Sequence, residues 1–199
     1  KGGKPAAIAA EIDPSGVIAR AMDISKFKGK AKSVVDIVAP ADASVDRIVV
    51  VGVGESDSIK EGDWAALGGT VRAKTASDKN LTVILDCDGV EIAPEAAAAF
   101  AQGMVLRAYD FDKYKTKKKD DEDGGDKPAA QKTTLMVDSP SDCKKAWTSA
   151  EGVARGIMLA RDLVNEPANI LGPVEFAARA DALSALGVEI EILTEKEMK

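Results

Sequence analysis

The residues best suited to chemistry in this sequence follow an apolar run, in the segment VVVGVG at positions 49–54. A strand that runs into G-x-G is typical of phosphate-binding turns. The dinucleotide fingerprint requires a third glycine three positions after Gly54, but Asp57 stands there, and its carboxylate would lie beside a pyrophosphate. We therefore interpret the segment as a strand ending in a glycine turn, with a variant phosphate-binding loop as the weaker alternative.

A second group of chemical side chains lies between positions 109 and 132. Five lysines are interleaved with aromatic residues and could contact a nucleic acid single strand by charge and stacking: Lys113, Lys115, Lys117, Lys118 and Lys119. The acidic run at positions 120–123 follows at once and cancels their field within a Debye length of about 8–10 Å. That run lacks the spacing of a calcium loop. We predict a solvated, mobile surface loop.

The remaining side chains offer little for catalysis. The chain has no His, which removes the commonest metal ligand, the commonest general base and every Ser-His or Cys-His nucleophile. Cys87 and Cys143 lie in separate segments, so we interpret them as structural or incidental thiols of a protein in a reducing compartment. We assign no catalytic, cofactor-binding or metal-binding residue. From these residues alone we expect a non-catalytic α/β domain.

Size and composition set the broad class of protein. The 199 residues are 45% hydrophobic, which excludes disorder of the whole chain and allows one domain or one domain plus part of a second. A net charge of −6 argues against a general nucleic-acid binder. No apolar run approaches the roughly 18 residues of a membrane span, and no signal-peptide core follows Lys1. We expect a soluble, cytoplasmic protein whose residues before Lys1 have been removed or left out.

Short β-branched runs alternate with helix-like segments along most of the chain. The pattern predicts strands over 6–12, 33–39, 47–53, 81–85 and 133–137, and helices over 17–24, 63–74 and 96–108. Pro94 suits the first turn of the last of these helices, because its missing N–H would be unpaired there anyway. Alternating elements of this kind indicate a sheet with helices packed against it.

A long amphipathic helix follows, with Ser139 as N-cap, Pro140 at the first helical position and a stop at Glu166, which precedes Pro167. Its apolar stripe recurs at helical spacing and consists of Trp147, Val153, Ala154, Ile157, Met158 and Val164. We expect another part of the protein to cover this stripe. In the isolated chain some of it should be exposed and adhesive.

The last residues look like the start of a second α/β domain. A helix over 173–186 should end at Gly187, and a strand over 188–193 alternates apolar residues with Glu189 and Glu191. A helix and one strand cannot form a core alone, and the chain stops six residues after that strand, at Lys199. We therefore expect that the remainder of this second domain is missing.

Two segments, LRAYDFDKYKTK at 106–117 and ARDLVNEPAN at 160–169, carry a family resemblance. They are similar to signatures of the leucyl (cytosol) aminopeptidases, the M17 metallopeptidases. Supporting matches lie at 27–30, 47–54 and 67–69, in the family's order. The sequence departs from the family pattern at Gly172, where Thr or Ser is usual. It also lacks the family's first strand, which would lie before Lys1, and the NTDAEGRL signature and the metal ligands, which would lie beyond Lys199.

The resemblance implies a parent enzyme that removes N-terminal residues from peptides with two divalent ions, Mn or Zn. It further implies a macro-like mixed α/β fold and a homo-hexamer. We expect an N-terminal domain over 1–138, an inter-domain helix and linker over 139–171, and the start of a truncated catalytic domain over 172–199. This piece should support assembly and access, should be inactive alone and should hold no metal.

Two other functions compete with this one. Macro-like folds in other proteins hold ADP-ribose at strand ends, and the turn at Gly52 and Gly54 is the support here for such a nucleotide-binding module. Some bacterial relatives of this family bind DNA. The acidic balance of this chain argues against that activity.

Overall fold

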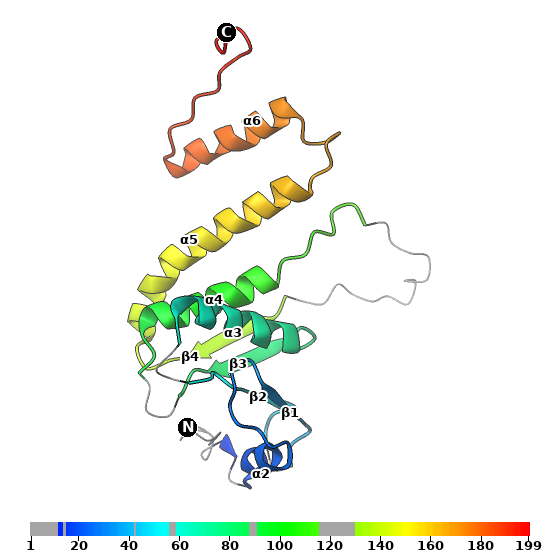
Figure 1. Cartoon of the computed structure of the whole chain (residues 1–199), viewed down its shortest axis with the longest axis vertical. Helices are drawn as coiled ribbons and strands as arrows, with labels where there is room; N and C mark the ends of the chain where they lie inside the picture. Colours follow the sequence, from blue (N-terminus) through cyan, green and yellow to red (C-terminus); the bar gives the residue numbers. More distant parts are fainter. Residues whose placement is uncertain (1–11, 14, 42, 56–58, 88–90, 116–129) are drawn as a thin grey trace. The chain divides into compact units, whose positions relative to one another are not determined.

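The computed structural model describes residues 12–13, 15–41, 43–55, 59–87, 91–115 and 130–199 (Figure 1). It divides into an N-terminal unit, Lys1–Asp110 with Lys115–Ala154, and a C-terminal unit, Phe111–Tyr114 with Arg155–Lys199. In the described part of the chain, no helix combines the length and apolar character needed to cross a membrane.

The N-terminal unit alternates strands and helices, as predicted from the sequence. Its elements are α2 (Val17–Ile24), β1 (Val34–Val38), β2 (Arg47–Val51), α3 (Glu61–Lys74), β3 (Asn80–Ile84), α4 (Pro94–Arg107), β4 (Lys132–Met136) and the start of α5 (Pro140–Asn165). Of the strand expected over 6–12, residues 6–11 lie outside the described residues, as do residues 116–129 of the predicted loop.

The strands pair in two small sheets. β1 and β2 are antiparallel, with Val34 opposite Val51, whereas β3 and β4 are parallel, with Asn80 opposite Lys132. A parallel pair needs a crossover connection, and α4 lies in that connection. The mixed α/β class is therefore confirmed. Among the residues that the structure describes, the pairing is divided between two sheets of two strands each.

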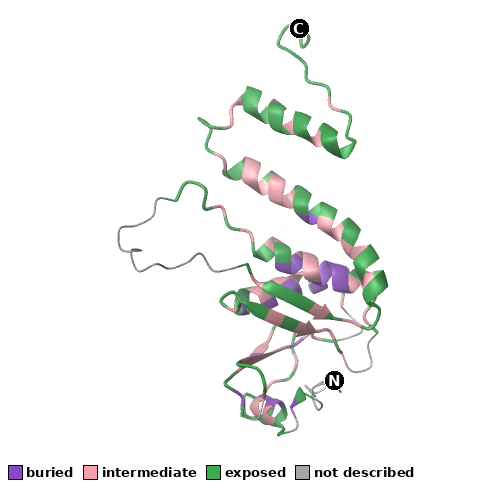
Figure 2. Cartoon of the chain, turned by 180° about the vertical axis from the view of Figure 1, so that it is seen from behind, coloured by how far each residue is buried: buried purple, intermediate pink, exposed green. Residues whose placement is uncertain are grey.

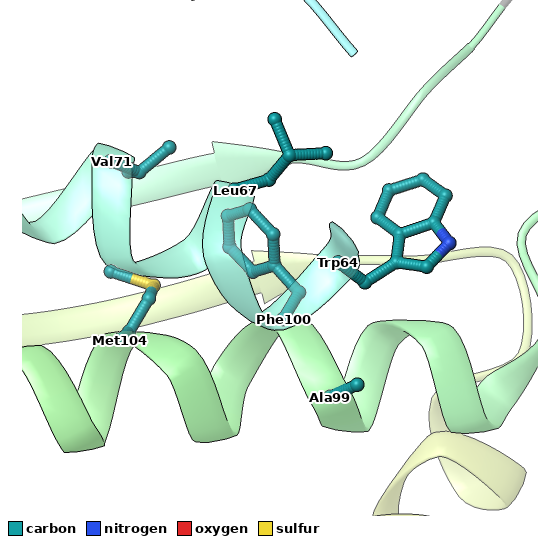
Figure 3. Packing of buried hydrophobic residues seen from close by; sticks show 6 residues of the cluster. All are labelled: Trp64, Leu67, Val71, Ala99, Phe100 and Met104. Atoms are coloured by element: carbon teal, nitrogen blue, oxygen red, sulfur yellow. The ribbon is translucent and has the colours of Figure 1, made fainter. Parts of the chain in front are cut away.

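The main core lies where α3 packs on α4 (Figure 3). Buried side chains of both helices face one another and form the centre of this core: Trp64, Leu67, Val71, Ala99, Phe100 and Met104. Residues of β2, β3 and β4, including Val51, Val83 and Leu135, pack against them. This core therefore joins helices and strands far apart in sequence, whereas α2 and β1 pack in a second cluster around Ile18, Met22 and Val35.

Two glycines bring the two helices together. A Cβ atom on Gly68 would lie 1.9 Å from the carbonyl oxygen of Phe100, and one on Gly103 would lie 1.8 Å from that of Ala65. Real Cβ atoms do not come that close to backbone, so α3 and α4 can adopt this spacing only with glycine at both positions.

The C-terminal unit is built around the end of α5. Its helix α6 (Pro173–Asp181) continues into a short 3₁₀ helix (Ala182–Leu186), which ends at Gly187 in the left-handed conformation with φ 84°. The predicted helix over 173–186 and its glycine stop are thus confirmed, with a tightened last turn. None of the residues of this unit is buried as a whole, and Figure 2 shows α6 as largely exposed.

One expectation about the end of the chain is wrong. Residues 188–193 form no strand, and Val188, Ile192 and Leu193 are exposed, because a strand needs a hydrogen-bonded partner and none of the described residues provides one. The apolar stripe of α5 is partly exposed, as expected for the isolated chain. Val153 and Val164 are exposed, and Ala154 is the buried residue of this helix.

Candidate functional site

The glycine turn after β2 is occupied by the protein's own backbone. The Gly52 N–H donates to the carbonyl of Ser33 at 2.8 Å, and the Gly54 N–H donates to that of Gly29 at 2.9 Å. A Cβ on Gly52 would lie 2.3 Å from the carbonyl oxygen of Lys30. Neither amide is therefore free to bind a phosphate. The interpretation of this segment as a strand ending in a glycine turn is confirmed.

The charged loop does not form a site within the described residues. Lys115 pairs with Asp110 at 3.2 Å, and both side chains are largely exposed. Lys117, Lys118, Lys119 and the acidic run at 120–123 lie outside the residues that the structure describes. In the described ranges, no group of three or more Cys, Asp or Glu side chains could hold a metal ion.

Both cysteines are half-buried free thiols. Burial raises the pKa of Cys87, and the neighbouring Asp86 raises it further. Burial and Asp142 likewise raise the pKa of Cys143. A raised pKa leaves little thiolate at neutral pH, so neither residue is activated as a nucleophile.

A polar cluster that the sequence analysis did not single out surrounds Glu166, and we call it the Glu166 clamp. Its members are Glu166, Lys113, Tyr114 and Arg179, all in the C-terminal unit. The Lys113 ammonium donates to Oε1 of Glu166 at 2.5 Å, and the Tyr114 hydroxyl donates to Oε2. Arg179 Nη2 lies 3.9 Å from Oε1. The Glu166 side chain is only 2% exposed.

Local backbone structure brings these groups together. Pro167 cannot continue α5, and its carbonyl accepts from the amides of Ile170 and Leu171, which closes a turn. The Glu175 carboxylate then accepts from the Gly172 amide at 3.1 Å and caps the start of α6. The turn and cap place Arg179, on α6, beside Glu166 at the end of α5.

Segment Phe111–Tyr114 has internal packing of its own. The rings of Phe111 and Tyr114 lie 5.9 Å apart, and the Lys113 ammonium lies 5.4 Å from the centre of the Tyr114 ring. An ammonium over an aromatic face is attracted by the electron density of the ring. This contact helps to orient both donors of the segment toward one carboxylate.

The clamp is suited to holding chain segments, and not to proton transfer. The hydrogen bonds from Lys113 and then Tyr114 lower the pKa of Glu166, so its carboxylate stays ionised at neutral pH. The same contacts with Glu166 raise the pKa of Lys113 and the pKa of Tyr114. A carboxylate stabilised in this way is a weak base.

The sequence signal for this cluster was present but incomplete. Lys113 and Tyr114 belong to the first segment that carries the family resemblance, and Glu166 belongs to the second. They are 53 and 52 residues apart, and no local periodicity links positions so distant.

Comparison with known proteins places the chain among aminopeptidase sequences. The model of the "Cytosol aminopeptidase family, N-terminal domain" matches residues 1–118. A probable cytosol aminopeptidase of Rhizobium meliloti (strain 1021) is 51% identical over 199 residues, which is 100% of this chain and 40% of the relative. One of Rhizobium etli (strain CIAT 652) is 52% identical over 195 residues, 98% of this chain and 39% of the relative. The chain spans about 40% of the length of such relatives.

Solved aminopeptidase and related structures have a fold similar to that of this chain. A tomato leucine aminopeptidase mutant superposes with a TM-score of 0.76 over 94% of this chain and 37% of its own, and at 24% identity this likeness shows the fold alone. The bottromycin maturation enzyme BotP, solved in complex with Mn, has a TM-score of 0.65 and 27% identity over 83% of this chain and 33% of its own.

Proposed function

The chain belongs to the cytosol aminopeptidase family, and we propose that it forms the N-terminal, non-catalytic portion of a leucyl aminopeptidase. The observation that carries this proposal is the extent of the similarity. The chain aligns over its full length, yet with only 40% of a relative named as a cytosol aminopeptidase. In the proposal, the reaction takes place in polypeptide that these relatives carry beyond the aligned part.

The chemistry of the described residues supports this division of labour. Hydrolysis by two metal ions requires several carboxylate, imidazole or amine ligands converging on adjacent ions. No such group of ligands forms in the part of the chain that the structure describes, so the described residues do not fit a two-metal centre. The Mn or Zn ions of the parent enzyme therefore belong, in this proposal, to the remaining polypeptide.

The exposed end of the C-terminal unit supports the same proposal. Residues 188–193 carry alternating apolar and acidic side chains but have no strand partner among the described residues. Val174 and Leu186 are also exposed. We infer that residues 172–199 begin the catalytic domain, that 139–171 link it to an N-terminal domain over 1–138, and that further polypeptide supplies the partner strand.

The larger assembly is part of the proposal as well. A homo-hexamer acting on peptides in the cytoplasm fits the family, with the macro-like N-terminal domain supporting assembly and access to the active site. The word "cytosol" in the names of the relatives supports the location. Size-exclusion chromatography with light scattering on the longer polypeptide would test the hexamer, and a monomer would contradict it.

Hydrolysis of leucine p-nitroanilide tests the proposed function. We expect no turnover by the 199-residue chain with Mn²⁺ or Zn²⁺ added, and metal-dependent turnover by a polypeptide of the relatives' full length that contains it. Metal-dependent turnover by the chain alone would contradict the proposal. So would an inactive full-length polypeptide that is folded and loaded with metal.

The nucleotide-binding alternative is not favoured. Its support was the glycine turn, whose two amides already donate to the carbonyls of Ser33 and Gly29. Calorimetry with ADP-ribose and NAD at millimolar concentration should show no heat of binding.

A further inference from the structure

We propose that Glu166 is a positioning residue, which fixes the path of the chain from α5 into α6 through its contacts with Lys113, Tyr114 and Arg179. The significance for catalysis rests on the proposed function, because the polypeptide that follows α6 would carry the reactive centre. Glu166 itself touches no substrate in this account. It acts through the placement of the chain that follows it.

The first argument is the contrast between Glu166 and its surroundings. No residue of the C-terminal unit is buried as a whole, and α6 has none buried. Apolar packing therefore does not determine where α6 lies. The Glu166 side chain is nevertheless 2% exposed and has two hydrogen bonds and an ion pair to its carboxylate. Polar contacts with Glu166 therefore fix the position of α6, as buried apolar packing does for α3 and α4.

The second argument is the cost of breaking the clamp. A carboxylate removed from water must keep its partners, because an uncompensated charge away from solvent is strongly unfavourable. Loss of Lys113 would leave the Glu166 carboxylate with the Tyr114 hydroxyl and the Arg179 guanidinium, which lies 3.9 Å away. Lys115, two residues after Lys113, forms an exposed ion pair with Asp110. Loss of either partner of this pair costs little, because water can solvate the charge that remains.

The third argument is the path of the chain. Segment Phe111–Tyr114 belongs to the C-terminal unit, although residues on both sides of it belong to the N-terminal unit. The contacts that hold this segment with Glu166 involve two of its four residues. Loss of these contacts would remove the two hydrogen bonds that join this segment to the residue before Pro167.

Competitive acetylation of the 199-residue chain tests the clamp without any assay of activity. Lys113 and Lys115 have similar side-chain exposure, 51% and 66%, so exposure alone predicts similar rates of reaction with acetic anhydride. We expect Lys113 to react roughly tenfold more slowly, because Glu166 holds its ammonium protonated and hydrogen-bonded. The two rates are measured by mass spectrometry.

Two variants sharpen this measurement. Glu166→Gln should raise the rate at Lys113 to that at Lys115 and leave Lys115 unchanged, whereas the matched control Asp110→Asn should change Lys115 alone. Glu166→Asp, which keeps the charge, should retain part of the protection even if Glu166→Gln disturbs folding. Equal rates in the unchanged chain, or a Lys113 rate that ignores both Glu166 variants, would overturn the proposal.

Kinetics of the full-length polypeptide test the consequence for catalysis. Glu166→Gln should lower kcat by about tenfold or more, since small misplacements of reacting groups are costly, with KM within about twofold. Asp110→Asn should leave kcat unchanged. An unaltered kcat in Glu166→Gln would refute the positioning role. Absence of activity in the unchanged polypeptide would instead contradict the proposed function. The acetylation rates would still show whether Glu166 holds Lys113 in the clamp.

Discussion

The packing of α3 on α4 and the junction of α5 with α6 are two helix pairs stabilised by different interactions. In the first pair, buried apolar side chains meet across two glycines, and Phe100 is 3% exposed. In the second, Phe176 of α6 is 53% exposed, and the contacts are those of the Glu166 clamp. A core confers stability on a unit, whereas a polar clamp confers geometry and little stability of its own.

This difference bears on function. The N-terminal unit has the buried apolar surface that a stable domain requires. The C-terminal unit lacks it, and its exposed apolar side chains are those expected of a surface that further polypeptide covers. The comparison supports the proposal that a non-catalytic domain is followed by the opening of another.

Truncating one phenylalanine in each region should give the largest difference. Phe100→Ala leaves a cavity in the core and should lower the free energy of unfolding by about 3–5 kcal/mol. Phe176→Ala removes an exposed ring and should change it by less than about 0.5 kcal/mol. Denaturant unfolding followed by far-UV circular dichroism, which reports on the helices of both units, measures both. Similar losses for the two variants would break the comparison.

Filling the glycine contact between α3 and α4 should have the next largest effect. Gly103→Ala places a methyl group against the Ala65 carbonyl, so the helices must separate, at a cost of about 1–3 kcal/mol. The melting temperature measures this loss. An unchanged melting temperature would show that the two helices do not require the close approach.

The clamp should weaken at both ends of the pH range. Because the folded pKa of Glu166 is lowered, its contribution to stability is present above the ordinary carboxyl value and is lost as pH falls through the lowered pKa. Because the folded pKa values of Lys113 and Tyr114 are raised, their contributions are present below their ordinary values and are lost as pH rises through the raised ones.

Titration of Tyr114 measures one of these pKa shifts directly. In the unchanged chain it should ionise above its ordinary value of 10.0, and Glu166→Gln should lower its pKa. Carbon-13 NMR resolves the ring signals, since the chain has two tyrosines. A pKa of Tyr114 that does not fall in the variant would argue against the clamp.

Gly152, in the part of α5 that belongs to the N-terminal unit, should show the smallest effect. A Cβ on Gly152 of α5 meets nothing within 4 Å. Gly152→Ala should therefore raise the free energy of unfolding by up to about 1 kcal/mol through helix propensity alone. Destabilisation, seen as a lower melting temperature, would mean that this face of α5 is packed in the chain as it stands.

Local sequence signals predicted most of the fold. Pro94, Pro140 and Pro167 marked two helix starts and one stop, because proline constrains its own backbone and that of the preceding residue. Gly187 marked the end of the 3₁₀ helix for the opposite reason, its tolerance of positive φ. Such signals act within a few residues, so the helix ends that they mark do not depend on which distant residues pack nearby.

What the sequence could not predict depends on distant partners. The alternation over 188–193 is a true β pattern, but a strand forms only when another strand accepts its hydrogen bonds. The helical spacing on α5 correctly indicated that part of its stripe, such as Val153 and Val164, would be exposed, but it does not say which polypeptide covers that stripe. The Glu166 clamp depends on contacts across more than fifty residues, which periodicity does not encode.

Native-state hydrogen exchange tests the central claim most directly, on the 199-residue chain and on the full-length polypeptide that contains it. We predict strong protection of α3 and α4 in both, and protection of residues 188–193 in the longer polypeptide alone. If the amides of 188–193 in the 199-residue chain were protected as strongly as those of α4, the C-terminal unit would be complete in itself, and the account would be contradicted.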